Sequence, residues 1–332
     1  MLKILIIKLG AKGDVVRTLP LLLGIKEKYP DSEIYWLTKP SSLEIVRTSP
    51  HVDKIFTIPH RFTEKFDVLY NFDIEDDATF PAKETEAGKK YGFYSDSGFI
   101  SSFNLASEYY INTLFDDEIK KNNQKTYQEM MFEVAELPYK KQHHPLYLDE
   151  KDKEYADNFV NENKLNTKKL IGIHMGAGPR WPSKAWAEEK VREFIKKAKQ
   201  KSYEILLFGG PDEIEKHEKL SRDLEQEGVK IYRNNPENTD REFFSLLNLC
   251  KVVVCSDSYA LHVSLALKKP TICLIFCSAV NEIEGYNLLT KLVAPRHNEF
   301  FPEKLDVYDE ELVNSISAEE VLKKVEESLP VS

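Results

Sequence analysis

The chain lacks an apolar run that approaches the ~18 consecutive residues required to cross a membrane. Residues 2–9 are largely aliphatic, but Lys8 interrupts them and no small-residue cleavage site follows. We therefore interpret this start as a buried strand rather than as a secretory signal. No helical pattern is both amphipathic and strongly basic, as stable attachment to a membrane surface would require. The sequence thus predicts a cytoplasmic protein.

Cysteine is scarce, with only four residues, all of them between positions 250 and 277. Their spacings of five, eighteen and four loosely imitate paired zinc ligands. Cys255 and Cys273 fall inside apolar runs, however, where free cysteine behaves as a small hydrophobic residue. The acidic residues near 73–77 also suggest a metal, but a flexible acidic turn is common without one. We expect reduced, buried cysteines and no metal site.

An excess of positive charge is also missing. The chain has 46 Lys and Arg residues against 55 Asp and Glu residues, a net charge of −9. Broad nucleic-acid binding requires a basic face that neutralises phosphates, so this balance argues against a nucleic-acid partner. It leaves room for a local basic site that binds a sugar phosphate. No repeat of about 20 to 50 residues is evident either.

With 332 residues, 42% of them apolar, the chain suits two domains of about 150 residues each. In its first half, apolar runs alternate with helical patterns. We expect strands at residues 2–9, 33–37, 54–58 and 68–72, and helices at 15–29 and 43–47. Such βαβ series build parallel sheets with right-handed crossovers. The loosely patterned residues 79–123 are expected to form specificity loops.

The second half repeats this alternation. Two expected helices, 126–137 and 149–164, come before it. The second series then begins with a strand at 170–174, and we expect its other strands at 203–208 and 229–232 and its helices at 188–200, 212–226 and 239–249. The fold class is therefore α/β, with two Rossmann-like parallel-sheet domains and a cleft between them. We assign residues 1–155 to the first domain and 156–315 to the second. Residues 316–332 form a C-terminal helix that packs on one of the two domains.

The most informative segment is residues 252–276, whose pattern is a buried strand, a polar turn, a helix and a second buried strand. Ser256, Asp257 and Ser258 stand where the helix begins, and His262 follows one turn later. The first N–H groups of a helix lack partners and its dipole is positive there, so this place favours an anion. His262 is either a histidine satisfied in the core or a group that holds a diphosphate. The segment predicts a phosphate-bearing ligand.

A second candidate is Asp14, which follows Gly13 at the carboxyl end of the first strand, where ligands gather in open α/β sheets. An aspartate at the start of a helix can cap its N–H groups. It can also act as a general base that accepts the proton of an attacking hydroxyl. Position alone leaves both roles open.

A third candidate follows the strand that ends at His174. Gly176 and Ala177 come next, and glycine lets backbone N–H groups approach a phosphate. Lys184, a few residues on, can supply the countercharge. This segment is neither a Walker motif nor a dinucleotide fingerprint, so it is weak evidence by itself.

The next strand in this half ends at Gly209, and Glu213 follows it. An acid at this place can accept hydrogen bonds from ribose hydroxyls. It can also favour the first turn of the following helix through the helix dipole. Three strand ends with groups suited to phosphate and ribose make a nucleotide the expected ligand.

Four motifs stand in one order along the chain: KGDVVRTLP at residues 12–20, WPSKAW at 181–186, FGGPDE at 208–213 and SDSYALHVSLAL at 256–267. Together they resemble glycosyltransferase family 9, the ADP-heptose:lipopolysaccharide heptosyltransferases, over most of the chain. The resemblance implies a GT-B fold, with an acceptor-binding first domain and a nucleotide-sugar-binding second domain facing a central cleft. It also implies inverting, metal-independent transfer without a cofactor. The sugar would be heptose or a related sugar, moved from ADP-heptose or another nucleotide sugar to a saccharide hydroxyl of lipopolysaccharide core or surface glycan.

The resemblance also implies roles for individual residues. Asp14 is similar to the base that deprotonates the acceptor, with Lys12 and Arg17 as acceptor-binding residues. Lys184 is similar to the partner of the donor phosphates, and Glu213 to the ribose-binding acid. The other implied donor-binding residues are His174, Gly176, Ala177, Asp257, Ser258 and His262. The implied partners are a nucleotide-sugar donor and a saccharide or glycolipid acceptor, with at most transient contact with the inner membrane.

Two places depart from the family pattern. Tyr259 stands where the family has a small glycine, which puts a ring where a donor would approach closely. Residues 277–279 are Cys-Ser-Ala in place of Gly-Pro-Thr. The donor sugar and nucleotide therefore stay open. Because fold alone does not fix a reaction, a nucleotide-sugar epimerase or hydrolase and a noncatalytic nucleotide-sugar-binding protein also stay open.

Overall fold

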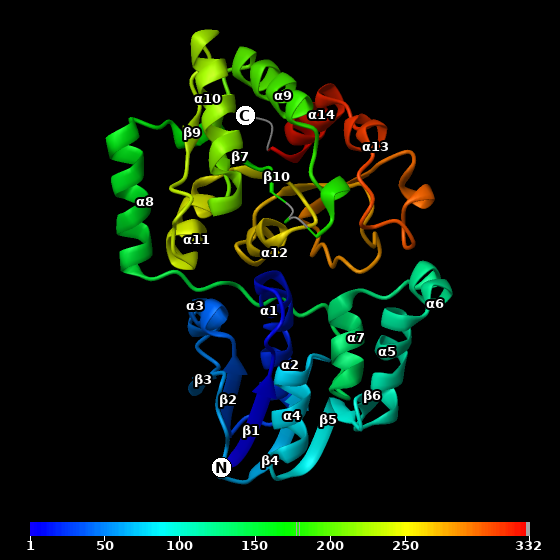
Figure 1. Cartoon of the computed structure of the whole chain (residues 1–332). Coiled ribbons are helices and arrows are strands. Elements are labelled where there is room, and N and C mark those ends of the chain that lie inside the picture. The colour runs from blue at the N-terminus through cyan, green and yellow to red at the C-terminus, as the bar shows by residue number, and fades with distance from the viewer. Residues whose placement is uncertain (177, 179, 330–332) are drawn as a thin grey trace. The chain divides into compact units, whose positions relative to one another are not determined.

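The chain divides into two units (Figure 1). The computed structural model describes residues 1–176, 178 and 180–329. The first unit consists of Met1–Tyr147 and Asn281–Glu284, and the second of Leu148–Val280 and Gly285–Ser332. The expected boundary at residue 155 falls inside helix α8 (Glu150–Asn163), which belongs to the second unit. A capping box at Asp149 begins this helix, so the division comes before it.

The first unit is built on a six-stranded sheet in the order β3-β2-β1-β4-β5-β6. Neighbouring strands are parallel except for β5 and β6, which form an antiparallel pair at one edge. The strands are β1 (Leu2–Ile7), β2 (Ser32–Thr38), β3 (Lys54–Thr57), β4 (Phe66–Asn71), β5 (Ala87–Asp96) and β6 (Phe99–Ser102). The helices are α1 (Lys12–Thr18), α2 (Leu21–Lys28), α3 (Leu43–Arg47), α4 (Asp76–Glu84), α5 (Glu108–Phe115), α6 (Asp117–Asn122) and α7 (Tyr127–Val134).

The spacing of apolar residues predicts one helix over residues 15–29, but the structure has two, α1 and α2. Pro20 stands between them. A proline has no N–H and its ring clashes with the preceding turn, so a regular helix does not run through it. The N–H of Leu22 donates to the carbonyl of Leu19 at 3.0 Å, and this tight turn joins the two helices.

The expectation that residues 79–123 form loops is wrong. This region holds most of α4, both β5 and β6, and α5 and α6. Gly92 lets β5 approach β4, because a Cβ there would lie 1.8 Å from the carbonyl oxygen of Asn71 and its φ is +92°. Since β5 lies beside the short edge strand β6, its residues mix lysine and tyrosine with glycine instead of forming an apolar run.

The second unit repeats the plan with a fully parallel sheet in the order β12-β11-β10-β7-β8-β9. Its strands are β7 (Leu170–His174), β8 (Glu204–Phe208), β9 (Tyr232–Arg233), β10 (Val252–Ser256), β11 (Thr271–Ile275) and β12 (Leu289–Val293). After α8, its helices are α9 (Glu188–Gln200), α10 (Ile214–Gln226), α11 (Asp240–Leu249), α12 (Tyr259–Ala266), α13 (Glu310–Asn314) and α14 (Ala318–Ser328). Residues 252–276 therefore form a strand, a helix and a strand, as predicted. The C-terminal helix α14 belongs to this unit, where Val321 and Val325 enter the core.

All four cysteines are free and buried, as the sequence predicts. Cys255 of β10 and Cys273 of β11 are register partners in the sheet. Burial raises the pKa of both thiols, which keeps them protonated. They fill the core as small apolar groups.

The chain returns to the first unit for four residues after β11, and we call Asn281–Glu284 the return segment. The N–H of Tyr127, at the start of α7, donates to the carbonyl of Glu282 at 2.9 Å. The hydroxyl of Tyr139 donates to the carboxylate of Glu284. A piece of chain that lies between two strands of the second sheet thus completes the first unit.

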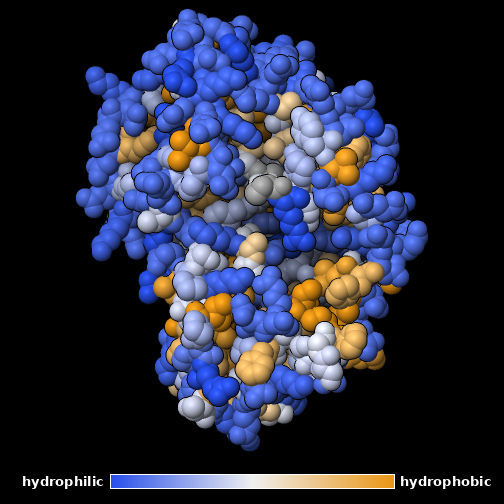
Figure 2. All heavy atoms as spheres, in the orientation of Figure 1, coloured by the Kyte–Doolittle hydropathy of each residue, from blue (hydrophilic) through white to orange (hydrophobic). Residues whose placement is uncertain are grey.

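The visible surface is mostly hydrophilic (Figure 2). Apolar groups reach the surface of the first unit over the region of α5 and α7. Phe99, Leu105 and Phe115 of this unit are exposed. None of the helices in the described part of the chain is long and apolar enough to span a membrane.

Candidate active site

Each sheet has one place where the strand order reverses. In the first sheet it lies between β1 and β4, and in the second between β7 and β10. In open parallel sheets, ligands bind beyond the carboxyl ends of the strands at such a reversal. Most of the predicted site residues follow these strands, and Glu213 follows β8, the neighbour of β7, so each unit has one candidate site.

In the second unit, Lys184 and Asp257 form an ion pair. Lys184 ends the short 3-10 helix η4 (Pro182–Lys184), and Asp257 follows β10. The Nζ of Lys184 lies 2.9 Å from Asp257 Oδ2, and the side chains of Lys184 and Asp257 are 9% and 19% exposed. The same Nζ lies 4.2 Å from the ring centroid of Trp181, within cation–π distance. A cation is therefore held directly beside the predicted anion site.

The start of α12 supplies the other half of this site. Ser258 is its N-cap, and the hydroxyl oxygen of Ser258 is buried with no hydrogen-bond partner among the described residues. His262 lies one turn along the helix, with Nε2 3.8 Å from Asp257 Oδ1. The structure thus brings Asp257, Ser258, His262 and Lys184 together. Hydrogen-bond donors and a positive charge converge where a diphosphate could bind.

Gly176 and Glu213 also meet, as the convergence of strand ends predicts. A Cβ on Gly176 would lie 2.5 Å from Glu213 Oε1, so only glycine leaves room for the carboxylate. The N–H of Gly210 donates to Glu213 Oε2 at 2.8 Å. Glu213 therefore stabilises the turn before α10, and it also lines a cavity of about 760 Å³ together with Gly176 and His217.

His174, at the end of β7, has a buried Nδ1 that makes no hydrogen bond within the part of the chain that the structure describes. Burial lowers its pKa to about 4, so its ring is neutral at physiological pH. The ring stands edge-on to Phe243, with 6.4 Å between centroids. The predicted contact of Ala177 lies outside the described residues.

Tyr259, the departure from the family glycine, packs on α11. Its ring stacks on Phe243 with 5.6 Å between centroids and an interplanar angle of 19°. Its hydroxyl donates to Asp240 Oδ1 at 3.0 Å. Burial, and then the Asp240 carboxylate, raise the pKa of the tyrosine, so the hydroxyl stays a donor. The other departure, residues 277–279, follows β11 directly, and the carbonyl of Ser278 lies 2.8 Å from Nε2 of His297.

In the first unit, Asp14 lies in the first turn of α1, which begins at Lys12. The residue in the N-cap position is Ala11, so Asp14 is not the N-cap. Arg17 donates to Asp14 Oδ1 from Nε at 3.0 Å, and its Nη2 lies 2.8 Å from the same oxygen. The guanidinium of Arg17 also covers the ring of Tyr127 at 3.7 Å from its centroid. Arg17 thus holds one carboxylate oxygen of Asp14 in place.

A buried ion pair that the sequence does not indicate lies beside Asp14. Lys8 Nζ lies 2.7 Å from Asp73 Oδ1. Asp73 also accepts from the N–H groups of Leu9 and Gly10. The sequence marks Lys8 only as a charge inside an apolar strand, and Asp73 only as part of an acidic turn. Asp73 instead anchors the turn that leads from β1 to α1.

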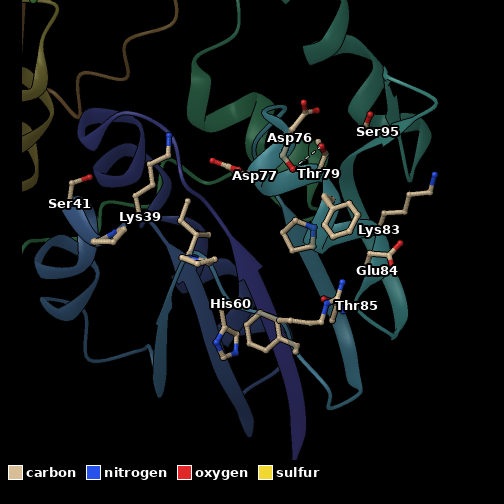
Figure 3. A pocket seen from close by; sticks show the side chains of 17 residues that line it. Lys39, Ser41, His60, Asp76, Asp77, Thr79, Lys83, Glu84, Thr85 and Ser95 are labelled. Carbon is tan, nitrogen blue, oxygen red and sulfur yellow. Dashed lines mark hydrogen bonds between the residues drawn. The ribbon is translucent and has the colours of Figure 1, made fainter.

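A cavity of about 1550 Å³ opens in the first unit (Figure 3). It lies along α4 and is also lined by residues that follow β2 and β3. Its apolar lining includes Ile58, Phe62 and Phe80, and its charged lining includes Asp76 and Asp77. Phe80 is 55% exposed. Aromatic rings beside carboxylates suit a ligand with both apolar faces and hydroxyl groups.

Residues 60–302 match the family model of glycosyltransferase family 9 (heptosyltransferase). The chain belongs to glycosyltransferase family 9. It is therefore a glycosyltransferase, as the four motifs predict. Within the described residues of this family 9 enzyme, no group of three or more His, Cys, Asp or Glu side chains is placed to hold a metal ion.

Named relatives of this family 9 glycosyltransferase are similar over most of their length. Lipooligosaccharide heptosyltransferase 2 of Haemophilus ducreyi is 26% identical over 290 residues, which cover 81% of both chains. Lipopolysaccharide heptosyltransferase 2 of Escherichia coli is 23% identical over 301 residues, 82% of both chains.

Solved structures agree with the fold of this family 9 enzyme. A family 9 glycosyl transferase from Veillonella parvula has a TM-score of 0.78 and 17% identity, over 98% of this chain and 96% of that one. The ADP-heptose lps heptosyltransferase II of E. coli has a TM-score of 0.69 and 17% identity, over 98% of both. The predicted GT-B fold class, with two Rossmann-like parallel-sheet units, is confirmed.

Proposed function

We propose that this glycosyltransferase moves heptose, or a related sugar, from ADP-heptose to a saccharide hydroxyl in the synthesis of lipopolysaccharide core or surface glycan. The transfer inverts the anomeric carbon and uses neither a metal nor a cofactor. The contact of Lys184 with Asp257 at the start of α12 carries the proposal, because it builds a protein site for a diphosphate leaving group. The heptosyltransferase names of the relatives support the choice of sugar.

The roles of the donor-binding residues follow from the negative charge that develops on the leaving group. As the bond between the anomeric carbon and the diphosphate oxygen breaks, negative charge develops on the leaving group. The ammonium of Lys184, the first N–H groups of α12 and the buried hydroxyl of Ser258 can stabilise that charge. His262 steadies Asp257 from the next turn. Glu213 accepts from the ribose hydroxyls of the nucleotide, with Gly176 leaving room for its carboxylate.

The acceptor side centres on Asp14. Its carboxylate accepts the proton of the acceptor hydroxyl as the oxygen forms its bond to the anomeric carbon. Arg17 holds Oδ1 and so fixes the direction in which the carboxylate points. Lys12 begins the same helix, and in this proposal it binds the acceptor. The more distant sugars of the acceptor occupy the cavity along α4. In this proposal the reaction takes place in the cytoplasm, with at most transient contact with the inner membrane.

The first experiment is calorimetric titration of the protein with ADP, UDP, GDP, CMP and ADP-heptose, comparing wild type with Lys184→Ala. Selective binding of ADP that weakens in the variant supports the proposed donor. Preference for another nucleotide changes the donor, and equal binding by the variant contradicts the role of Lys184.

The transfer step is tested with Asp14→Ala and an acceptor prepared as a deacylated core oligosaccharide. We expect donor binding near that of wild type and a transfer rate lower by about 100-fold or more, as for the loss of a general base. Product analysis gives the anomeric configuration. Sugar that is epimerised or released to water without dependence on acceptor would favour an epimerase or hydrolase instead.

A further inference from the structure

Asp73 binds Lys8 and the turn after β1 at the same time. Its Oδ1 lies 2.7 Å from Lys8 Nζ, and the side chains of Lys8 and Asp73 are 3% and 10% exposed. Its Oδ2 accepts from the N–H of Gly10 at 2.9 Å and from the N–H of Leu9. Lys8 Nζ also donates to the carbonyl of Phe72 at 3.1 Å. The ammonium is thus held on the β4 side of the turn.

Gly10 marks the place where three charged groups converge. A Cβ on this residue would lie 3.2 Å from Lys8 Nζ, 3.2 Å from Asp73 Oδ1 and 3.3 Å from Asp14 Oδ2. The ammonium therefore has two carboxylates around one small space. Arg17 engages Oδ1 of Asp14, so Oδ2 is the oxygen that faces the ammonium across Gly10.

Other charged and titratable groups surround Asp14 on several elements. The groups that act on this network are Arg17 on α1, Tyr110 on α5, Tyr127 on α7, and Glu282 on the return segment. Lys12 is the first residue of α1. Burial works against the charged form of Lys8, but Asp73 outweighs it and raises the pKa of the lysine, so the ammonium stays charged. Burial raises the pKa of Tyr110, which stays neutral. Lys8 is consequently always charged. In the structure its ammonium neutralises the carboxylate of Asp73, and Asp14 is the other carboxylate near it.

We propose that Asp73 is a positioning residue that holds Lys8 away from Asp14 and so preserves the ability of Asp14 to take the acceptor's proton. The inference rests on the proposed role of Asp14 as the base. A further cation against a carboxylate stabilises its charged form and makes it a weaker proton acceptor. Asp73 neutralises the ammonium before it can do so, and its bonds to the N–H groups of Leu9 and Gly10 keep the turn in place.

The test compares Asp73→Asn, Lys8→Gln and the double variant Lys8→Gln/Asp73→Asn in the full chain. In Asp73→Asn the ammonium loses its carboxylate and turns to Asp14. We expect kcat to fall by up to about 10-fold and the acid limb of the pH–rate profile to move to lower pH by about one unit. KM for the donor stays unchanged. In the double variant the ammonium of residue 8 is gone and Arg17 stays on Asp14 as in wild type, so both kcat and the acid limb recover toward wild type.

The double variant also keeps the test informative if Asp73→Asn alone folds poorly, because it leaves no unpaired buried charge. Lys65→Gln/Glu86→Gln, an exposed pair at 2.6 Å in the same unit, serves as the control and keeps the wild-type profile. An unchanged acid limb in Asp73→Asn, or a double variant no faster than Asp73→Asn, would overturn the inference.

A separate measurement distinguishes this inference from the proposed function. If Asp14→Asn transfers sugar at the wild-type rate, the role of Asp14 itself fails. If Asp14→Asn is inactive while Asp73→Asn keeps the wild-type profile, only the role of Asp73 fails.

Discussion

Lys184 and Asp257 form an ion pair of 2.9 Å that joins η4 to the turn between β10 and α12. Both side chains are largely buried, so each charge depends on the other. We expect Asp257→Asn to lower the free energy of unfolding by about 3 kcal/mol, because it leaves a buried ammonium without its carboxylate. Added ADP should restore part of this loss, since phosphates replace the carboxylate. Urea unfolding with and without ADP measures both effects.

The matched control for this prediction is Glu327→Gln, which breaks the exposed pair that Lys324 and Glu327 form at 2.6 Å. It should change stability by less than about 1 kcal/mol and should not respond to ADP. Equal losses in the two variants would mean that burial of the Lys184 pair has no energetic effect.

Gly176→Ala tests the contact with Glu213. The added Cβ would lie 2.5 Å from Glu213 Oε1, the flexible end of a side chain, so the carboxylate should move while the fold remains. We expect a melting temperature close to that of wild type and nucleotide binding about 10-fold weaker, equivalent to ~1.4 kcal/mol. Calorimetry beside Glu213→Gln measures this. Wild-type affinity in Gly176→Ala would show that the carboxylate does not contact the nucleotide.

Tyr259→Phe keeps the ring on Phe243 and removes the hydrogen bond to Asp240. The loss of a bond to a carboxylate should cost about 1.5 to 3 kcal/mol of stability. Nucleotide affinity should stay within about twofold of wild type, because the ring packs on α11. Tyr259→Gly removes the ring altogether. If ADP-heptose then bound more tightly than in wild type, the ring would be shown to limit the donor site, contrary to this prediction.

His144 predicts a pH dependence of stability. It is buried, and its Nε2 lies 2.9 Å from the hydroxyl of Ser49. Burial, and then the charge of His51, lower the pKa of His144 to about 4 from its ordinary 6.5. Between these values the unfolded chain binds a proton that the folded chain does not. The free energy of unfolding should therefore fall as pH drops from about 6.5 to about 4, by on the order of 1 to 3 kcal/mol.

The measurement is urea unfolding of wild type and His144→Gln at pH 7 and pH 5. The variant should lose less stability between the two pH values. His60→Gln, which removes an exposed histidine, should behave as wild type. A loss of equal size in all three proteins would assign the pH dependence to other groups.

The cavity along α4 predicts an effect on the acceptor alone. Phe80→Ala should raise KM for the acceptor about 5-fold or more, since it removes ~1 kcal/mol of apolar contact, and should leave nucleotide binding unchanged. Phe115→Ala, another exposed phenylalanine of the first unit, is the control. A change in donor binding without a change in acceptor KM would contradict this use of the cavity.

The strand ends could be predicted from sequence because their signals are local. The run 252–276 is long and apolar enough to show β10, α12 and β11 directly. Strands that end beside one another bring their next residues together, so the meetings of Gly176 with Glu213 and of Lys184 with Asp257 follow from the order of the elements.

The parts that could not be predicted depend on contacts between distant residues or on weak patterns. Lys8 and Asp73 are 65 residues apart, and nothing near either one shows that they pair. The mixed composition of β5 resembles that of a loop. Its place in the sheet depends on Gly92 and on its pairing with β4, which the residues of β5 alone do not show. The direction of the Tyr259 ring depends on Phe243 and Asp240, which belong to a different helix.

The return segment has a consequence for how the protein can be made and recombined. Because the partners of Tyr127 and Tyr139 lie at Glu282 and Glu284, the first unit has all its hydrogen bonds only after most of the chain has been synthesised. A fragment that stops at Tyr147 would lack the hydrogen bonds that Tyr127 and Tyr139 make to this segment. Exchange of first units between relatives would therefore have to carry residues 281–284 as well as 1–147, since a single crossover separates parts that belong together.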